Sequence, residues 1–172
     1  LNLESVARSI EILTDQEKFG ISRRKITVST SGYIEMLNRF VDLDLGVKIA
    51  ISLHAPNQMI REKIMPTVAK SNRLEDLLDA LDNFTKKTNK RVTYEYLLLK
   101  GINDSEENAI ELAELLKNKL VLVNLIEYNE NDLADIKGSP NTKIFQKILI
   151  KNGITCTVRN SYGEEIKGAC GQ

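Results

Sequence analysis

The chain has 172 residues, of which 42% are apolar and 28% are charged, a balance typical of a globular protein with its own core. Its 24 lysines and arginines equal its 24 aspartates and glutamates, so the net charge indicates no nucleic-acid partner. No apolar run reaches membrane-spanning length, and a single histidine excludes a histidine-rich metal site. Two cysteines are too few for a disulfide scaffold, so we expect a reducing, cytoplasmic setting.

Helical and strand patterns alternate along the chain. Apolar spacing and capping signals predict helices over residues 3–17, 33–41, 57–65, 72–88, 104–117 and 140–153. Apolar runs predict strands over residues 25–30, 47–53, 91–99, 120–128 and 154–158, the second buried on both faces. This alternation predicts an α/β fold of parallel βα units, in a partial barrel or an open doubly wound sheet. Five strands are too few to close a barrel.

Two helix boundaries have specific signals. Pro66 is expected to end the helix that starts near residue 57, because proline removes a backbone donor. Asn72 and Glu75 have the spacing of a capping box, which predicts the start of the next helix.

Polar residues follow each predicted strand at its carboxyl end, where parallel α/β folds place their working sites. They are Ser29, Ser31, Ser52, His54, Asn103 and Asn129. Hydroxyl, imidazole and amide groups would converge there on one face and could bind a ligand with ribose and amino-acid groups. No acid–base pair or Ser-His-Asp order is evident among them.

Taken singly, each of these residues also has a structural explanation. Ser29 and Ser31 could be turn residues, and His54 could serve packing or hydrogen bonding. Asn103 could start a helix, and Asn129 could be a loop residue. Only their convergence at successive strand ends favours a ligand site.

One compact basic cluster lies before the first predicted strand, at Arg23, Arg24 and Lys25. These residues are candidates for RNA phosphate contact, and a solvated basic run explains them equally well.

The two cysteines differ in context. Cys156 alternates with Ile154 and Val158, which predicts a core position in the last strand. Cys170 lies among small residues, where nothing bulky shields the sulfur, so it is either a nucleophile or an incidental cysteine.

Five segments, in order along the whole chain, resemble the bacterial radical S-adenosylmethionine (SAM) adenine-C2 methyltransferases of 23S rRNA and tRNA. They are RRKITVSTSG (23–32), ISLHAPN (51–57), GIND (101–104), VNLIEYN (123–129) and ACGQ (169–172). The resemblance implies that residues 1–172 are the C-terminal part of a radical-SAM (β/α) barrel that lacks its first strands. It also implies that SAM is bound by Ser29, Ser52, Leu53, His54 and Asn129.

The same resemblance implies a role for Cys170, in the tail of residues 160–172, as an S-methylcysteine intermediate. In that family one SAM methylates the cysteine, and a [4Fe-4S] cluster cleaves a second SAM to a radical that activates the methyl group. The methylene radical then adds to C2 of adenine, a carbon too electron-poor to attack a sulfonium methyl group. The implied partners are 23S rRNA, tRNA and an electron donor such as flavodoxin. The sequence does not specify an oligomeric state.

The chain also departs from the family pattern. It lacks the Cys-x-x-x-Cys-x-x-Cys that holds the cluster, the Gly-Glu-Pro segment and the upstream resolving cysteine, so we expect no metal ligands and no turnover from this chain alone. Asn129 is followed by Glu130, where the family usually has proline. Three alternatives remain open: C8 methylation by the sister family, a noncatalytic RNA-binding module, and an unrelated βα domain.

Overall fold

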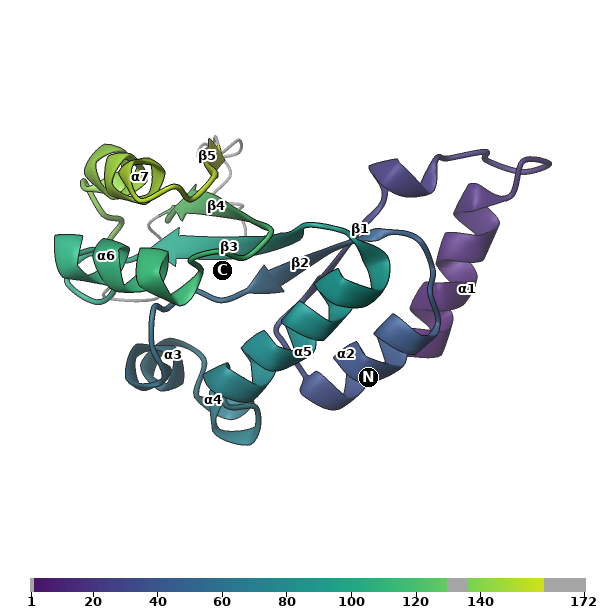
Figure 1. The fold of residues 1–172 in the computed structure, drawn as a ribbon, viewed down its shortest axis with the longest axis horizontal. Coiled ribbons are helices and arrows are strands. Elements are labelled where there is room, and N and C mark those ends of the chain that lie inside the picture. The colour runs from purple at the N-terminus through teal and green to yellow at the C-terminus, as the bar shows by residue number, and fades with distance from the viewer. Residues whose placement is uncertain (1, 130–135, 160–172) are drawn as a thin grey trace.

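The five strands form one parallel sheet in chain order in the computed structural model, which describes residues 2–129 and 136–159 (Figure 1). They are β1 (Thr27–Thr30), β2 (Lys48–Ser52), β3 (Val92–Leu98), β4 (Val121–Glu127) and β5 (Cys156–Arg159). Every neighbouring pair is parallel. This order, with each strand beside its successor, is that of a partial barrel. The predicted α/β class and all five predicted strands are confirmed.

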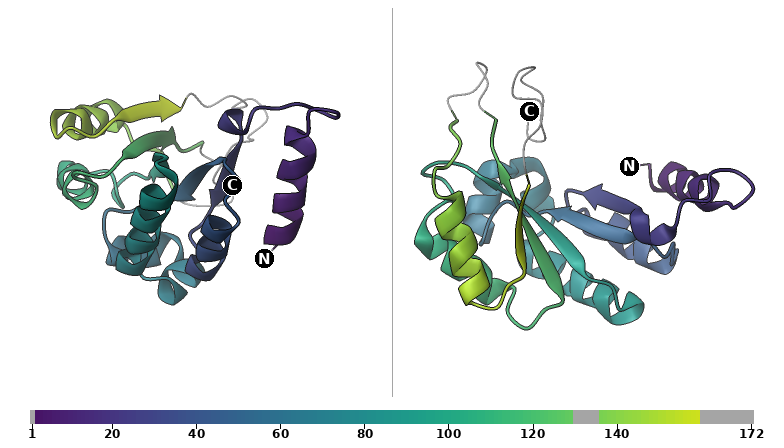
Figure 2. Two further views of the ribbon diagram at one scale, coloured as in Figure 1. Left: turned by 45° about the vertical axis from the view of Figure 1, so that its right-hand side comes forward. Right: turned by 90° about the horizontal axis from the view of Figure 1, so that it is seen from above.

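Helices connect successive strands along one face of the sheet, and one further helix, α1, precedes β1 (Figures 1 and 2). They are α1 (Leu3–Thr14), α2 (Ile34–Asp42), α3 (Gln58–Ile64), α4 (Pro66–Ser71), α5 (Leu74–Thr88), α6 (Glu106–Leu115) and α7 (Thr142–Lys151), with a short 3-10 helix, η1 (Arg23–Lys25), before β1. None of the helices within the described ranges has the length and apolar character needed to cross a membrane.

The two faces of the sheet differ in chemistry because successive side chains of a strand point to opposite faces. Ile49 and Ile51 of β2, and Tyr94 and Tyr96 of β3, are buried in the main core beneath the helices. The alternate positions, such as half-buried Ser52, face the other way. Ala50, which points to the open face, is buried as well, whereas Lys48 is exposed, so the expectation that segment 47–53 is buried on both faces is confirmed only at its centre.

Two helix starts differ from their sequence signals. The helix that starts near residue 57 ends at Ile64, before Pro66, as predicted, but Pro66 itself begins α4, because the first turn of a helix does not require a backbone N–H from proline. Asn72 does not cap α5: its Oδ1 accepts a hydrogen bond from the Ile34 backbone N–H (2.9 Å), so that oxygen serves the start of α2. The capping box lies instead at Ser105 and Asn108 of α6.

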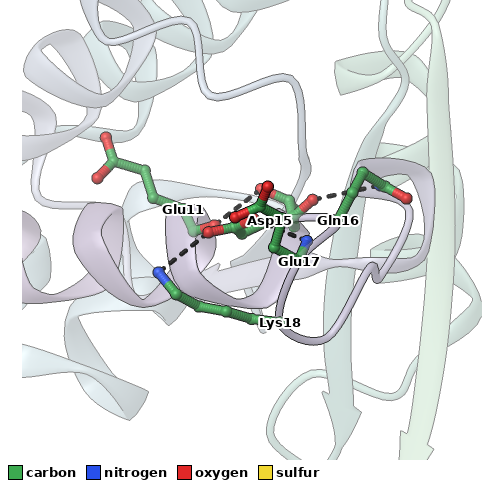
Figure 3. A network of polar contacts seen from close by, with 6 residues as sticks. Glu11, Asp15, Gln16, Glu17 and Lys18 are labelled. Carbon is green, nitrogen blue, oxygen red and sulfur yellow. Dashed lines mark hydrogen bonds and ion pairs between the residues drawn. The ribbon is translucent and has the colours of Figure 1, made fainter.

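The chain leaves α1 through a small polar network (Figure 3). Asp15 accepts a hydrogen bond from the Glu17 backbone N–H (2.9 Å) and forms an ion pair with Lys18 (3.0 Å). Lys18 is the main reason that the pKa of Asp15 lies below its usual value. The helix thus ends at Thr14, three residues earlier than its periodicity indicates.

The turn after β1 depends on Gly32, and we expect Gly32→Ala to lower the free energy of unfolding by about 2 kcal/mol. Its φ is +94°, and an added Cβ would lie 3.0 Å from Leu77 Cδ2 and 3.2 Å from Arg61 Nη2. Gly101→Ala is a matched control, because Gly101 also has a positive φ (+69°) but open space around it, so about 1 kcal/mol is expected. Urea unfolding of both variants measures the difference. Equal losses would contradict the packing part of the explanation.

Candidate functional site

A cavity of about 350 Å³ lies on the face of the sheet that the helices leave open. Its lining residues come from all five strands and from the turn after β2: Thr27, Ser29, Ala50, Ser52, His54, Glu95, Leu97, Ile126 and Arg159. The structure therefore brings together Ser29, Ser52 and His54, three of the residues predicted from the strand ends.

His54 lies where β2 leaves the sheet, in the left-handed region with a φ of 57°. Its Nδ1 accepts a hydrogen bond from the Leu97 backbone N–H (3.0 Å). Burial, assisted by the positive charge of Arg61, lowers the pKa of His54 to about 4. The imidazole is therefore neutral at physiological pH and suited to hydrogen bonding, not to carrying a positive charge.

A row of polar side chains crosses the cavity face of β3, β4 and β5. Asn124 donates through Nδ2 to Glu95 Oε2 (2.9 Å), and Thr157 Oγ1 donates to Asn124 Oδ1 (3.0 Å). These two bonds fix the orientation of the amide and hold the Glu95 carboxylate on the lining of the cavity. Glu95 can thus accept hydrogen bonds from a ligand but, when ionised, can donate none.

The chemistry of the lining is mixed. Hydroxyl groups, one carboxylate and one guanidinium lie beside the apolar side chains of Ala50, Leu97 and Ile126. Such a surface suits a ligand that combines an apolar ring with hydroxyl and charged groups.

Three other predicted site residues are not among the described lining residues of the cavity. Leu53 is fully buried in the main core, so it can place its neighbours but exposes no surface to a ligand here. Half-buried Asn129 follows β4 at the same edge of the sheet and is not among the described lining residues. Cys170 lies outside the described residues.

The basic cluster of Arg23, Arg24 and Lys25 forms η1 and is exposed. It precedes β1, so in this parallel sheet it lies at the opposite edge from the strand ends that carry Ser52 and His54. Arg23 also donates through Nη1 to the Leu45 carbonyl oxygen. The cavity reaches Thr27 at the start of β1, two residues after Lys25, so an RNA contact by this cluster would lie beyond the end of the cavity opposite His54.

Cys156 lies in β5 and packs against the main core, in agreement with its sequence context. Burial raises the pKa of its thiol to about 12, so the reactive thiolate is rare at neutral pH. The described part of the chain contains no group of three or more His, Cys, Asp or Glu residues able to hold a metal ion.

The sequence analysis missed several residues of the site region, and Glu95 and Arg61 are the two with the clearest contrast. Glu95 had a usable signal, since a carboxylate between two tyrosines in an apolar strand needs a partner or a polar cavity. Arg61 had none, because its neighbours Glu62 and Lys63 make it look like part of a solvated helix face. Arg61 is in fact fully buried.

Curated relatives match almost the whole chain. A dual-specificity RNA methyltransferase RlmN from Malacoplasma penetrans is 47% identical over 171 residues, which are 99% of this chain and 48% of that protein. The protein of the same name from Clostridium novyi is 41% identical over 99% of this chain and 50% of its own length. A ribosomal RNA large subunit methyltransferase N from Nitrosopumilus maritimus is 42% identical. No family model matches the chain.

Solved structures with a similar fold include a radical SAM methyltransferase. A radical SAM methyltransferase from Sphaerobacter thermophilus superposes with a TM-score of 0.94 at 40% identity, over 99% of this chain and 50% of that one. A domain of a pyruvate-formate lyase-activating enzyme from Bacteroides vulgatus, at 17% identity and a TM-score of 0.65, shares the fold alone. The chain spans about half the length of the curated relatives it matches. By sequence and by fold, the chain is similar to about half of the RNA methyltransferases named RlmN and of a solved radical SAM methyltransferase.

Proposed function

We propose that this chain is the C-terminal, SAM-binding part of an enzyme that methylates C2 of an adenosine in 23S rRNA and tRNA. The observation that carries the proposal is the cavity that joins Ser29, Ser52 and His54. Relatives named as dual-specificity RNA methyltransferases support it. In this proposal Leu53 places its two neighbours, and Asn129 contacts the ligand from the edge of the site. Such an enzyme would act in the cytoplasm.

The residues on the open face fit SAM chemically. Its adenine ring needs apolar surface, and its ribose hydroxyls and amino-acid group need hydrogen-bonding and charged partners. Leu97 and Ile126 supply the apolar surface, and Ser29, Ser52 and Glu95 supply polar partners on the same lining. Bound there, SAM would supply the methyl group and, with a reduced cluster, the radical chemistry that C2 of adenine requires.

The chain does not fit a [4Fe-4S] cluster, because its sequence contains two cysteines and the cluster needs at least three closely spaced ones. We therefore assign the cluster, and delivery of its electron by a donor such as flavodoxin, to the remainder of the enzyme. Cys170, in the tail of residues 160–172, is proposed as the residue that carries the methyl group as S-methylcysteine. Cys156 is unsuited to that role, because burial keeps its thiol protonated.

The test joins this chain to the upstream half of the Malacoplasma penetrans relative and supplies the chimera to cells that lack adenine-C2 methylation. Mass spectrometry of nucleosides from 23S rRNA and tRNA is expected to detect 2-methyladenosine. Recovery of 8-methyladenosine would assign the chain to the sister activity. A folded chimera that holds its cluster but methylates neither position would contradict the proposal. A chimera that carries both Ser52→Ala and His54→Ala measures the contribution of the cavity. Its yield of 2-methyladenosine is expected to fall in 23S rRNA and in tRNA alike.

A further inference from the structure

The end of β3 has backbone groups that no strand can satisfy, because β2 ends at Ser52 while β3 continues to Leu98. Two side chains replace the missing strand. The Leu97 backbone N–H donates to His54 Nδ1 (3.0 Å), and the Leu97 carbonyl accepts from Asn103 Nδ2 (2.7 Å). The Leu99 backbone N–H donates to Asn103 Oδ1 (2.8 Å). Both side chains thus complete the edge at which the cavity lies.

Asn103 also holds the main chain of His54. Its Nδ2 donates a second hydrogen bond to the His54 carbonyl oxygen (2.7 Å), and Asn103 is fully buried. Rotating the amide by half a turn would place Oδ1 against two carbonyl oxygens, so this orientation is the one the contacts permit. The bond helps to hold His54 in its left-handed conformation, which is uncommon for residues other than glycine.

We propose that Asn103 is a positioning residue that fixes His54 as a hydrogen-bond donor protonated at Nε2. Nδ1 accepts the Leu97 N–H and so carries no proton, which leaves the proton of the neutral ring on Nε2. The low pKa of His54 agrees with a ring that stays neutral. Because His54 lines the cavity, Nε2 is the ring nitrogen left for a ligand.

The consequence is a selectivity rule for the cavity. A neutral imidazole that donates through Nε2 favours a hydrogen-bond acceptor at that place, such as a carboxylate, a hydroxyl oxygen or an unprotonated ring nitrogen, and disfavours an ammonium group. This rule rests on the proposed function only for the identity of the ligand. SAM fits the rule because it carries a carboxylate, hydroxyl oxygens and unprotonated ring nitrogens. The assignment of the tautomer rests on contacts within the chain.

The chain has one histidine, so its ring nitrogens can be observed without overlap. In the whole chain labelled with ¹⁵N-histidine, NMR at pH 7 is expected to show a single tautomer, with a protonated Nε2 and an unprotonated Nδ1. With uniform ¹⁵N labelling, a scalar coupling between the Leu97 amide nitrogen and Nδ1 is expected across their hydrogen bond. A ring protonated at Nδ1, or an even mixture of tautomers, would overturn the proposal without any variant.

Variants test the part played by Asn103. Asn103→Asp keeps the shape and one acceptor but removes both donors, so we expect a mixture of tautomers and loss of the coupling. Tyr96→Phe is the matched control, because it removes the buried hydrogen bond from the Tyr96 hydroxyl to the main-chain carbonyl oxygen of Asn103 (2.8 Å) and leaves the side-chain amide of Asn103 unchanged. It is expected to lower stability but to leave the tautomer unchanged. A tautomer unchanged in folded Asn103→Asp, or altered equally in both variants, would refute the positioning role. These measurements need no ligand, so their outcome is independent of methyl transfer by the chimera. The positioning role of Asn103 can be refuted while the proposed function is supported, or supported while the proposed function is refuted.

Discussion

Replacing Arg61 with alanine is expected to lower the free energy of unfolding by about 3–5 kcal/mol, the largest effect of any single substitution considered for this chain. Arg61 Nη1 donates to the Asn72 carbonyl oxygen (3.0 Å), and Nη2 donates to the Ser31 carbonyl oxygen (2.9 Å). One fully buried guanidinium thus joins α3, the start of α5 and the turn after β1. Alanine would remove the donor from one buried and one partly buried carbonyl oxygen and would leave a cavity in place of the side chain.

Arg73→Ala is the matched control, since Arg73 is an exposed arginine at the start of α5 and its loss should change stability by no more than about 0.5 kcal/mol. Arg61→Lys keeps the positive charge but not the planar fork, so an intermediate loss is expected. Urea unfolding followed by circular dichroism measures all three variants. If Arg61→Ala were no more destabilising than Arg73→Ala, the buried position of Arg61 would be wrong.

The folded chain is expected to lose about 3 kcal/mol of stability through His54 alone as the pH falls from 6.5 to 4. In the folded state the pKa of His54 is about 4, whereas an unfolded histidine titrates near its ordinary value of 6.5. Between these two values the unfolded state binds the extra proton, so stability decreases as the pH falls. Above pH 6.5 and below pH 4 both states have the same charge at this residue, and the contribution is constant.

The charges around His54 act in opposite directions. Burial disfavours the imidazolium, as does the positive charge of Arg61. On the cavity lining, the Glu95 carboxylate would favour it and the Arg159 guanidinium would disfavour it. Carboxylates also titrate near pH 4, so the useful quantity is the stability of the unaltered chain minus that of His54→Gln. Urea unfolding at several pH values gives this difference. It should fall by about 3 kcal/mol across the window, and a constant difference would show that His54 titrates normally in the folded chain.

The sequence predicted the sheet well because its three central strands are rich in apolar residues and strong helical patterns separate the strands. It failed where two physical rules compete at one residue. Pro66 both ends one helix and begins another: α3 ends at Ile64, before the proline, as predicted, and Pro66 also begins α4, which the sequence signal did not indicate. Asn72 has the spacing of a cap, but its side chain is taken by the distant backbone of Ile34.

The candidate site could be predicted in part. Ser29, Ser52 and His54 were found because parallel strands bring their carboxyl ends to one edge, which is a rule of topology. The remaining residues depend on tertiary contacts that no local pattern encodes. Asn103 resembles a helix-start residue in the sequence, yet its amide bonds the end of β3 and the main chain of His54, which is 49 positions away. Arg61 is buried although its neighbours in the sequence are polar.

The central claim is that this chain binds SAM on the open face of its sheet and carries the methyl group on Cys170. The most direct measurement is peptide mass spectrometry of the chimera after incubation with SAM labelled in its methyl group. The account predicts the label on Cys170, none on Cys156, and strong loss of the label when Ser52 and His54 are both replaced by alanine. Transfer of the label to adenosine by a Cys170→Ala chimera, at the rate of the unaltered protein, would contradict it.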